Sequence, residues 1–126
     1  MNNEWTRYLI EWGCGATFTR EDPELAAERA IINAMSHVCP LDYESLGEIN
    51  VERDLMVDVL IGVPEPERVT TSKLASLIPY NCKKNIRVVR GGLIGKGVID
   101  KATGRTVNVV VAVAFITIYV RKNRVI

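Results

Sequence analysis

Residues Val107–Val120 read VNVVVAVAFITIYV, and this stretch decides the fold of the chain. Its most apolar run, Val109 to Val120, is far shorter than the roughly 20 residues of a membrane-spanning helix. Its Val and Ile content instead predicts a buried β-strand. Alternate side chains of a strand point to opposite faces, and both sets are apolar here: Val109, Val111, Val113 and Phe115 on one face, and Val110, Ala112, Ala114, Ile116 and Ile118 on the other. Such a strand must be covered on both sides.

Three more strands and two helices are predicted before it. The strands are Trp5–Trp12, Leu55–Gly62 and Asn85–Arg90, where apolar residues recur with the two-residue period of a strand. The helices run from Asp22, a residue suited to capping, to just before Pro40, and from Thr71 to Leu77. Residues 41–54 are expected to form a loop. The order β-α-β-α-β-β predicts a single α/β (α+β) domain over residues 1–126, with a single-layer sheet of about four strands, mostly antiparallel or mixed, and both helices on one face.

The doubly apolar last strand also predicts self-association. Two helices cover roughly one face of a four-stranded sheet, so the other face needs a partner, and another copy of the chain is the simplest one. A sheet that curls and closes on itself is the alternative. We therefore expect a homo-oligomer whose sheet faces meet.

Composition excludes several classes of function. Sixteen basic and fifteen acidic residues give a formal net charge of +1, which provides no field to attract nucleic acid or an anionic membrane. The start of the chain lacks the apolar core of a secretory signal, which favours a cytoplasmic protein. Three widely spaced cysteines (Cys14, Cys39, Cys82) and one histidine give no support for a disulfide framework, a metal site or a cofactor.

The first candidate binding segment is Gly13–Arg20. Gly13-Cys14-Gly15 follows a predicted strand and precedes a helix, as in a phosphate-binding loop, but Phe18 stands where the third glycine of that motif belongs. A tight turn is the simpler interpretation. The backbone N–H groups ahead of the helix, with Thr17, Thr19 and Arg20, could still bind an anion.

The second candidate segment is Arg90–Lys96, which contains Gly91 and Gly92. The stretch Gly92–Gly97 resembles a P-loop but departs from it, because Arg90 replaces the first glycine and Gly97 replaces the Ser or Thr that binds magnesium. A glycine-rich hairpin passage is the simpler interpretation. The functional alternative is that Arg90 and Lys96 recognise an anionic or carbonyl oxygen.

Two further signals have stronger structural explanations. Ser72 and Lys73 could suggest a nucleophile and its base, but adjacent helical residues do not face each other. His37 lies at the end of the first helix, where interaction with the helix dipole is expected rather than general-base catalysis.

Several stretches resemble the Lin-type family of conserved hypothetical proteins over nearly the whole chain. They are Arg7–Glu11 leading into Gly13-x-Gly15, Ser36-His37-x-Cys39, Ile61–Pro64, Ile78–Tyr80, Val88-x-x-Gly91-Gly92 and the final Val-rich strand. The family is marked by G-x-G-x-D-x-H-G. Here Gly13 and Gly15 match, whereas Thr17, Thr19 and Arg20 stand at the aspartate, histidine and last glycine.

More distantly, the succession helix, strand, small-residue turn is similar to one repeat of the ring-opening amidohydrolases, cyanuric acid hydrolase and barbiturase. That resemblance implies a homotrimer with sites between subunits. The Ser-Gly-Gly turn of those enzymes is replaced by Ile61-Gly62-Val63, which has no serine.

Three hypotheses result. The first is a homotrimeric small-molecule-binding protein whose interfacial pocket is lined by the two candidate segments. If this protein is catalytic, we expect it to hydrolyse cyclic amides. The second is a non-catalytic interaction module that binds another protein through its apolar sheet face. The third, nucleic-acid binding, is disfavoured by the charge.

Overall fold

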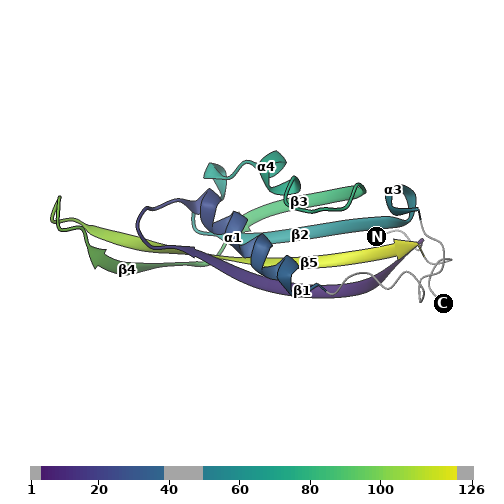
Figure 1. Cartoon of the computed structure of the whole chain (residues 1–126), viewed down its shortest axis with the longest axis horizontal. Helices are drawn as coiled ribbons and strands as arrows, with labels where there is room; N and C mark the ends of the chain where they lie inside the picture. The colour runs from purple at the N-terminus through teal and green to yellow at the C-terminus, as the bar shows by residue number, and fades with distance from the viewer. Residues whose placement is uncertain (1–3, 39–49, 122–126) are drawn as a thin grey trace.

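A five-stranded mixed sheet forms the body of the computed structural model, which describes residues 4–38 and 50–121 (Figure 1). Its strands are β1 (Trp5–Thr17), β2 (Leu55–Val63), β3 (Lys83–Arg90), β4 (Leu93–Ile99) and β5 (Thr106–Arg121). Around them lie α1 (Pro23–Ser36), α3 (Val51–Asp54), the 3-10 helix η1 (Pro66–Arg68) and α4 (Thr71–Ala75). The predicted α+β class and mixed, mostly antiparallel sheet are confirmed.

Strand β5 is the centre of the sheet, as its sequence predicts. It pairs antiparallel with β1, β2 and β4, and the remaining pair, β2 with β3, is parallel. From Val110 onward its even-numbered side chains lie under the helices and are at most 3% exposed: Val110, Ala112, Ala114, Ile116, Ile118 and Val120. Its odd-numbered side chains point to the opposite face, where Val113 and Phe115 are 41% and 45% exposed.

Helix α1 packs directly on the backbone of β1. Asp22 caps it as predicted, accepting a hydrogen bond of 3.0 Å from the backbone N–H of Leu25. It ends at Ser36, with His37 as C-cap and the His37 ring nitrogen Nδ1 3.1 Å from the carbonyl oxygen of Trp12.

The predicted break of the first strand at Gly13-Cys14-Gly15 is wrong, because β1 continues through these residues to Thr17. A Cβ on Gly13 would lie 2.3 Å from the backbone nitrogen of Ala34, and one on Gly15 would lie 2.4 Å from that of Ala30. The two glycines therefore allow α1 to approach the sheet, and they do not form a turn.

The glycine-rich stretch Gly92–Gly97 lies mostly in a strand that the sequence analysis did not predict, since Leu93–Ile99 forms β4 and pairs with β5 as a hairpin. Gly91 and Gly92 carry the chain from the edge of β2 to the edge of β5. Gly92 has φ +66°, and a Cβ there would lie 2.1 Å from the carbonyl oxygen of Val111. Only glycine accommodates both constraints.

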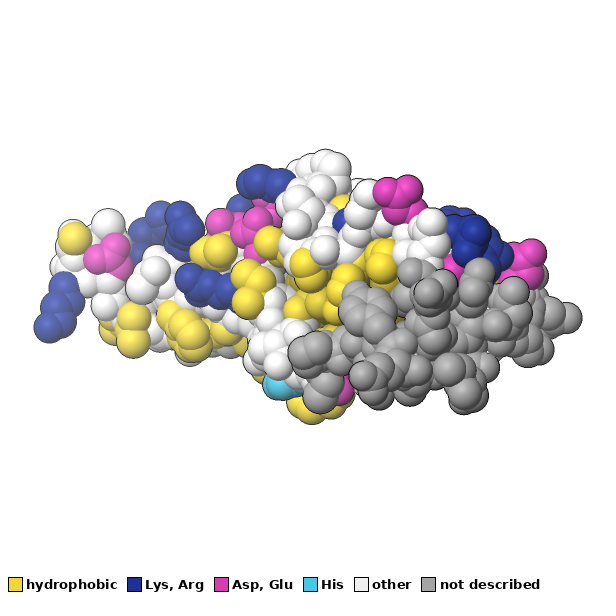
Figure 2. Space-filling model, turned by 45° about the vertical axis from the view of Figure 1, so that its right-hand side comes forward, with side chains coloured by type: hydrophobic (Ala, Val, Ile, Leu, Met, Phe, Trp, Pro, Cys, Tyr) yellow, Lys and Arg dark blue, Asp and Glu magenta, His cyan; other side chains and the backbone are white. Residues whose placement is uncertain are grey.

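Beyond the end of β2, strand β4 pairs with the start of β5, and past Thr17 of β1 this pair continues as a two-stranded ribbon. We call residues 93–109 the arm. The arm projects from one end of the molecule in Figure 1, and in Figure 2 hydrophobic side chains lie along its lower side. Four of its large apolar side chains are 52–71% exposed: Leu93, Ile94, Val98 and Ile99.

Smaller predictions differ at element ends. Helix α4 is shorter than predicted, ending at Ala75, and its N-cap Thr70 makes no side-chain capping bond. Of the predicted loop 41–54, residues 51–54 form α3, whereas residues 41–49 and Cys39 lie outside the described residues. Within the described ranges, no helix is long and apolar enough to cross a membrane.

Candidate functional site

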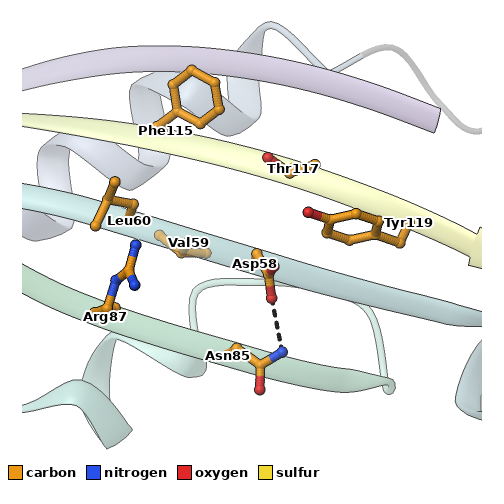
Figure 3. Close-up of a pocket in the computed structure, with 8 residues that line it drawn as sticks. All are labelled: Asp58, Val59, Leu60, Asn85, Arg87, Phe115, Thr117 and Tyr119. Carbon is orange, nitrogen blue, oxygen red and sulfur yellow. Dashed lines mark hydrogen bonds between the residues drawn. The ribbon is translucent and has the colours of Figure 1, made fainter. Parts of the chain in front are cut away.

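The sheet face opposite the helices carries a hollow of about 410 Å³ among the strands β2, β3 and β5. We call this the open face. The hollow is lined by Asp58, Val59, Leu60, Asn85, Arg87, Phe115, Thr117 and Tyr119 (Figure 3). Alternation along the strands places the polar members on the open face together, because Asp58 is directly opposite Thr117 on β5 and Asn85 on β3.

A carboxylate and an amide form the polar centre of the hollow. Asn85 donates a hydrogen bond of 2.7 Å from Nδ2 to Oδ1 of Asp58, drawn as the dashed line in Figure 3. Thr117 and Tyr119 are only 7% and 8% exposed, and the Tyr119 hydroxyl points back along β5 toward Thr117 and Asp58. The arrangement can accept hydrogen bonds through Asp58 and donate them through the two hydroxyls.

A cation lies at the other end of the hollow. The Arg87 side chain extends from β3 toward β2, and its guanidinium ends beside Leu60 (Figure 3). None of the ion pairs found among residues 4–38 and 50–121 includes Arg87. The ring of Phe115 adds an apolar wall. The hollow thus combines one cation, one carboxylate and an apolar surface.

Apolar side chains surround the hollow on the open face. Trp12 and Phe115 are paired across β1 and β5, and Val89 and Val113 are both opposite Gly62. The exposed members of this set are Ile10 (48%), Trp12 (61%), Val89 (40%), Leu93 (70%), Val113 (41%) and Phe115 (45%). The part of the chain that the structure describes places no helix over them.

The residues of the segment Gly13–Arg20 lie in two different environments. Gly13 and Gly15 contact α1 through their backbone, and Thr17 is 1% exposed with a hydroxyl that has no hydrogen-bond partner among the described residues. Thr19 and Arg20 are exposed in the turn before α1 and line a second, shallower hollow of about 260 Å³ with residues of the arm: Asp100, Thr103, Arg105, Thr106 and Val107.

The segment Arg90–Lys96 lies on the other side of β5. Arg90 donates to the carbonyl oxygen of Pro64 at 2.7 Å and lies 3.7 Å from Glu67. Gly91 and Gly92 form the crossover, and Lys96 is exposed on β4 opposite Asn108. Because Thr17 and Ile94 flank Val110 on β5, the two candidate segments are two strand spacings apart, roughly 10 Å. Neither of the two hollows is lined by residues of both segments.

Lys73 is engaged in an ion pair. Its Nζ lies 3.0 Å from Oε1 of Glu24, whose Oε2 accepts from the backbone N–H of Thr70 at 2.7 Å. The hydrogen bond to Glu24 raises the pKa of Lys73, and the hydrogen bonds from Lys73 and Thr70 lower the pKa of Glu24. A protonated lysine is not a base for Ser72, which agrees with the structural interpretation of that pair.

No candidate of the sequence analysis lies in the larger hollow. The available signal was Asp58 and Asn85, which are polar residues within apolar strands. Their meeting depends on the parallel register of β2 and β3, which the sequence does not specify. Among the described residues, no group of three or more His, Cys, Asp or Glu side chains could hold a metal ion.

Comparison with known proteins gives a family and a fold. The model of a family described as conserved hypothetical protein (Lin0512_fam) matches residues 7–118. The crystal structure of an FtsZ-like protein of unknown function from Nostoc punctiforme is similar, with a TM-score of 0.76 and 26% identity over 94% of this chain and 98% of that chain. No curated protein matches the sequence.

Proposed function

The chain belongs to the Lin0512_fam family of conserved hypothetical proteins, and from the geometry of its sheet we propose that it is a homo-oligomeric small-molecule-binding protein. The observation that carries the proposal is the position of the hollow. Asp58, Asn85 and Arg87 are grouped within the same sheet face that exposes Trp12 and Phe115. A copy that covers the apolar residues would also close the hollow.

The size of the apolar surface supports self-association. The exposed parts of the six large side chains on the open face amount to on the order of 600 Å², the upper end for the largest patch of a typical monomer. A standard interface buries about 800 Å² on each partner. The open face and its polar margin are thus large enough for a stable contact. We propose a trimer, following the resemblance of the helix–strand–turn succession to the threefold amidohydrolases.

The catalytic form of the proposal is hydrolysis of a cyclic amide in the hollow. There, Asp58 would take a proton from water while the water oxygen bonds to the amide carbon, and the C–N bond would break as the protonated Asp58 returns that proton to the leaving nitrogen. Arg87 would stabilise the charge that develops on the carbonyl oxygen. Ring opening of barbiturate or cyanurate, followed by loss of absorbance, tests this form separately from binding.

Native mass spectrometry of the full chain tests the assembly. We expect the wild-type protein to be a trimer and Phe115→Glu to be a monomer, because the substitution places a charge in the contact. Ile32→Glu is the matched control, since Ile32 is 56% exposed on α1, away from the open face. A monomeric wild-type protein, or equal assembly of both variants, would refute the proposed association.

The exposed arm favours a second candidate function, a non-catalytic interaction module. A two-stranded ribbon is marginally stable in water on its own. This ribbon exposes Leu93 on the open face and Ile94 on the helix side, so a protein partner that covers it would stabilise it. If this function is correct, Leu93→Glu with Ile94→Glu abolishes a stable complex with a different protein and leaves ligand binding unchanged.

A further inference from the structure

We infer that the hollow takes a small planar ligand with an anionic group at one end and an N–H donor at the other. This inference rests on the proposed function, because it assigns a ligand class to the same hollow. A volume of about 410 Å³ falls in the lower part of the range of small-molecule sites, roughly 300–1,000 Å³. The polar groups at the two ends define what such a ligand must carry.

The end of the hollow at Asp58 selects hydrogen-bond donors. Oδ1 of Asp58 accepts from Asn85, and no other donor among the described residues contacts this carboxylate. Oδ2 of Asp58 and the amide oxygen of Asn85 are acceptors that can serve a ligand. A ligand N–H placed there forms a charge-assisted hydrogen bond, which is stronger than a neutral one.

The opposite end, at Arg87, selects an anion. A guanidinium presents its N–H groups as a planar fork that matches a carboxylate through two parallel hydrogen bonds. Arg87 is exposed and has no carboxylate partner among residues 4–38 and 50–121, so a ligand carboxylate does not have to displace one.

Strand geometry sets the separation of the two ends. Asn85 is opposite Asp58, and Arg87 is opposite Leu60, so the acceptor and the cation are two residues apart along neighbouring strands. Two residues of a β-strand span about 6.6 Å. A single six-membered ring with para substituents has this length. Phe115 and Leu60 provide apolar surface for the face of such a ring (Figure 3).

Three probes test the ligand class on the full chain by ¹⁵N NMR titration. They are 4-aminobenzoate, which carries both groups, benzoate, which lacks the donor, and aniline, which lacks the anion. We expect 4-aminobenzoate to bind at least about tenfold more tightly than either of the others, with shifts at Asp58, Asn85 and Arg87, because each of the other probes lacks one of the two charge-assisted hydrogen bonds. Equal affinities, shifts elsewhere, or no binding by about 10 mM would overturn the inference.

Variants locate the two ends. Arg87→Gln should weaken 4-aminobenzoate at least about tenfold and leave aniline unchanged, whereas Asp58→Asn should weaken aniline and 4-aminobenzoate and leave benzoate unchanged. Arg105→Gln, on the arm, is the matched control and should change none of the three affinities. The inference is wrong if Arg87→Gln weakens all three probes alike.

Native mass spectra of the same samples separate this inference from the proposed association. A monomer that binds 4-aminobenzoate through Arg87 and Asp58 would refute the homo-oligomer and support the ligand class. An oligomer that binds no probe would support association and overturn the ligand class.

Discussion

Gly15 of β1 lies against Ala30 of α1 so closely that a Cβ on Gly15 would be 2.4 Å from the Ala30 backbone nitrogen. Gly13 has the same relation to Ala34, one helical turn further along. The helix side is correspondingly lined by small residues, since Ala26, Ala27, Ala30 and Ala34 are fully buried. Backbone therefore packs on backbone at this contact, with no room for a methyl group.

Gly15→Ala tests that contact. The added methyl group must displace the α1 backbone, so we expect the free energy of unfolding to fall by about 2–3 kcal/mol in urea denaturation. Gly95→Ala is the control, because nothing lies within 4 Å of a Cβ at Gly95, and alanine is favoured over glycine in a strand by about 0.5–1 kcal/mol. Equal unfolding free energies for the two variants would contradict the close packing.

Gly92→Ala tests the crossover between β3 and β4. Its methyl group would meet the carbonyl oxygen of Val111 at 2.1 Å in a backbone with φ +66°. Gly104 also has positive φ, +72°, but nothing lies within 4 Å of a Cβ there. We expect Gly104→Ala to cost about 1 kcal/mol from backbone strain and Gly92→Ala to cost at least about 2 kcal/mol. Thermal denaturation of both variants measures the difference, and equal melting temperatures would show that the carbonyl contact is unimportant.

Elements with strong local signals could be predicted from the sequence. The apolar alternation of Val107–Val120 predicts the central strand, and the Asp22-Pro23 start predicts α1. Glycines were misread where their role is tertiary. Gly13 and Gly15 were interpreted as a turn because a local pattern cannot reveal a helix that packs on a strand from more than ten residues away.

The hollow could not be predicted, for a related reason. Asp58 and Asn85 are 27 residues apart and meet through the parallel pairing of β2 with β3. Candidate residues chosen from glycine-rich stretches lay elsewhere, because those glycines serve packing and the crossover. The family resemblance, by contrast, was carried by short motifs along the chain and is confirmed over residues 7–118.

The pH dependence of stability should reveal the link between α1 and α4. The hydrogen bonds from Lys73 and Thr70 lower the pKa of Glu24 below its ordinary value of 4.5. The ionised form of Glu24 is therefore more favourable in the folded state than in the unfolded state. The stability that results is present above pH 4.5 and is lost as the pH falls through the lowered pKa of Glu24.

Glu24→Gln removes this dependence. We expect its urea midpoint to lie below that of the wild type at pH 7, and we expect the difference to shrink as the pH falls through the lowered pKa of Glu24, where the wild-type carboxyl becomes protonated. Glu11→Gln is the control, because Glu11 has no ion pair among the described residues. If the urea midpoint of the wild type exceeds that of Glu24→Gln by as much at pH 3 as at pH 7, the ionised pair of Glu24 and Lys73 is not the cause of the difference.

Thr17→Val should stabilise the protein. Thr17 is 1% exposed, and its hydroxyl has no hydrogen-bond partner among the described residues, so the folded state bears the cost of removing that hydroxyl from water. Valine has nearly the same shape without the hydroxyl, and we expect a gain of about 1 kcal/mol in the free energy of unfolding. Thr19→Val is the exposed control and should change it by less than about 0.5 kcal/mol. A loss of stability in Thr17→Val, measured by urea denaturation of ligand-free protein, would mean that the hydroxyl is satisfied in solution, because only a bonded hydroxyl is missed when valine replaces it.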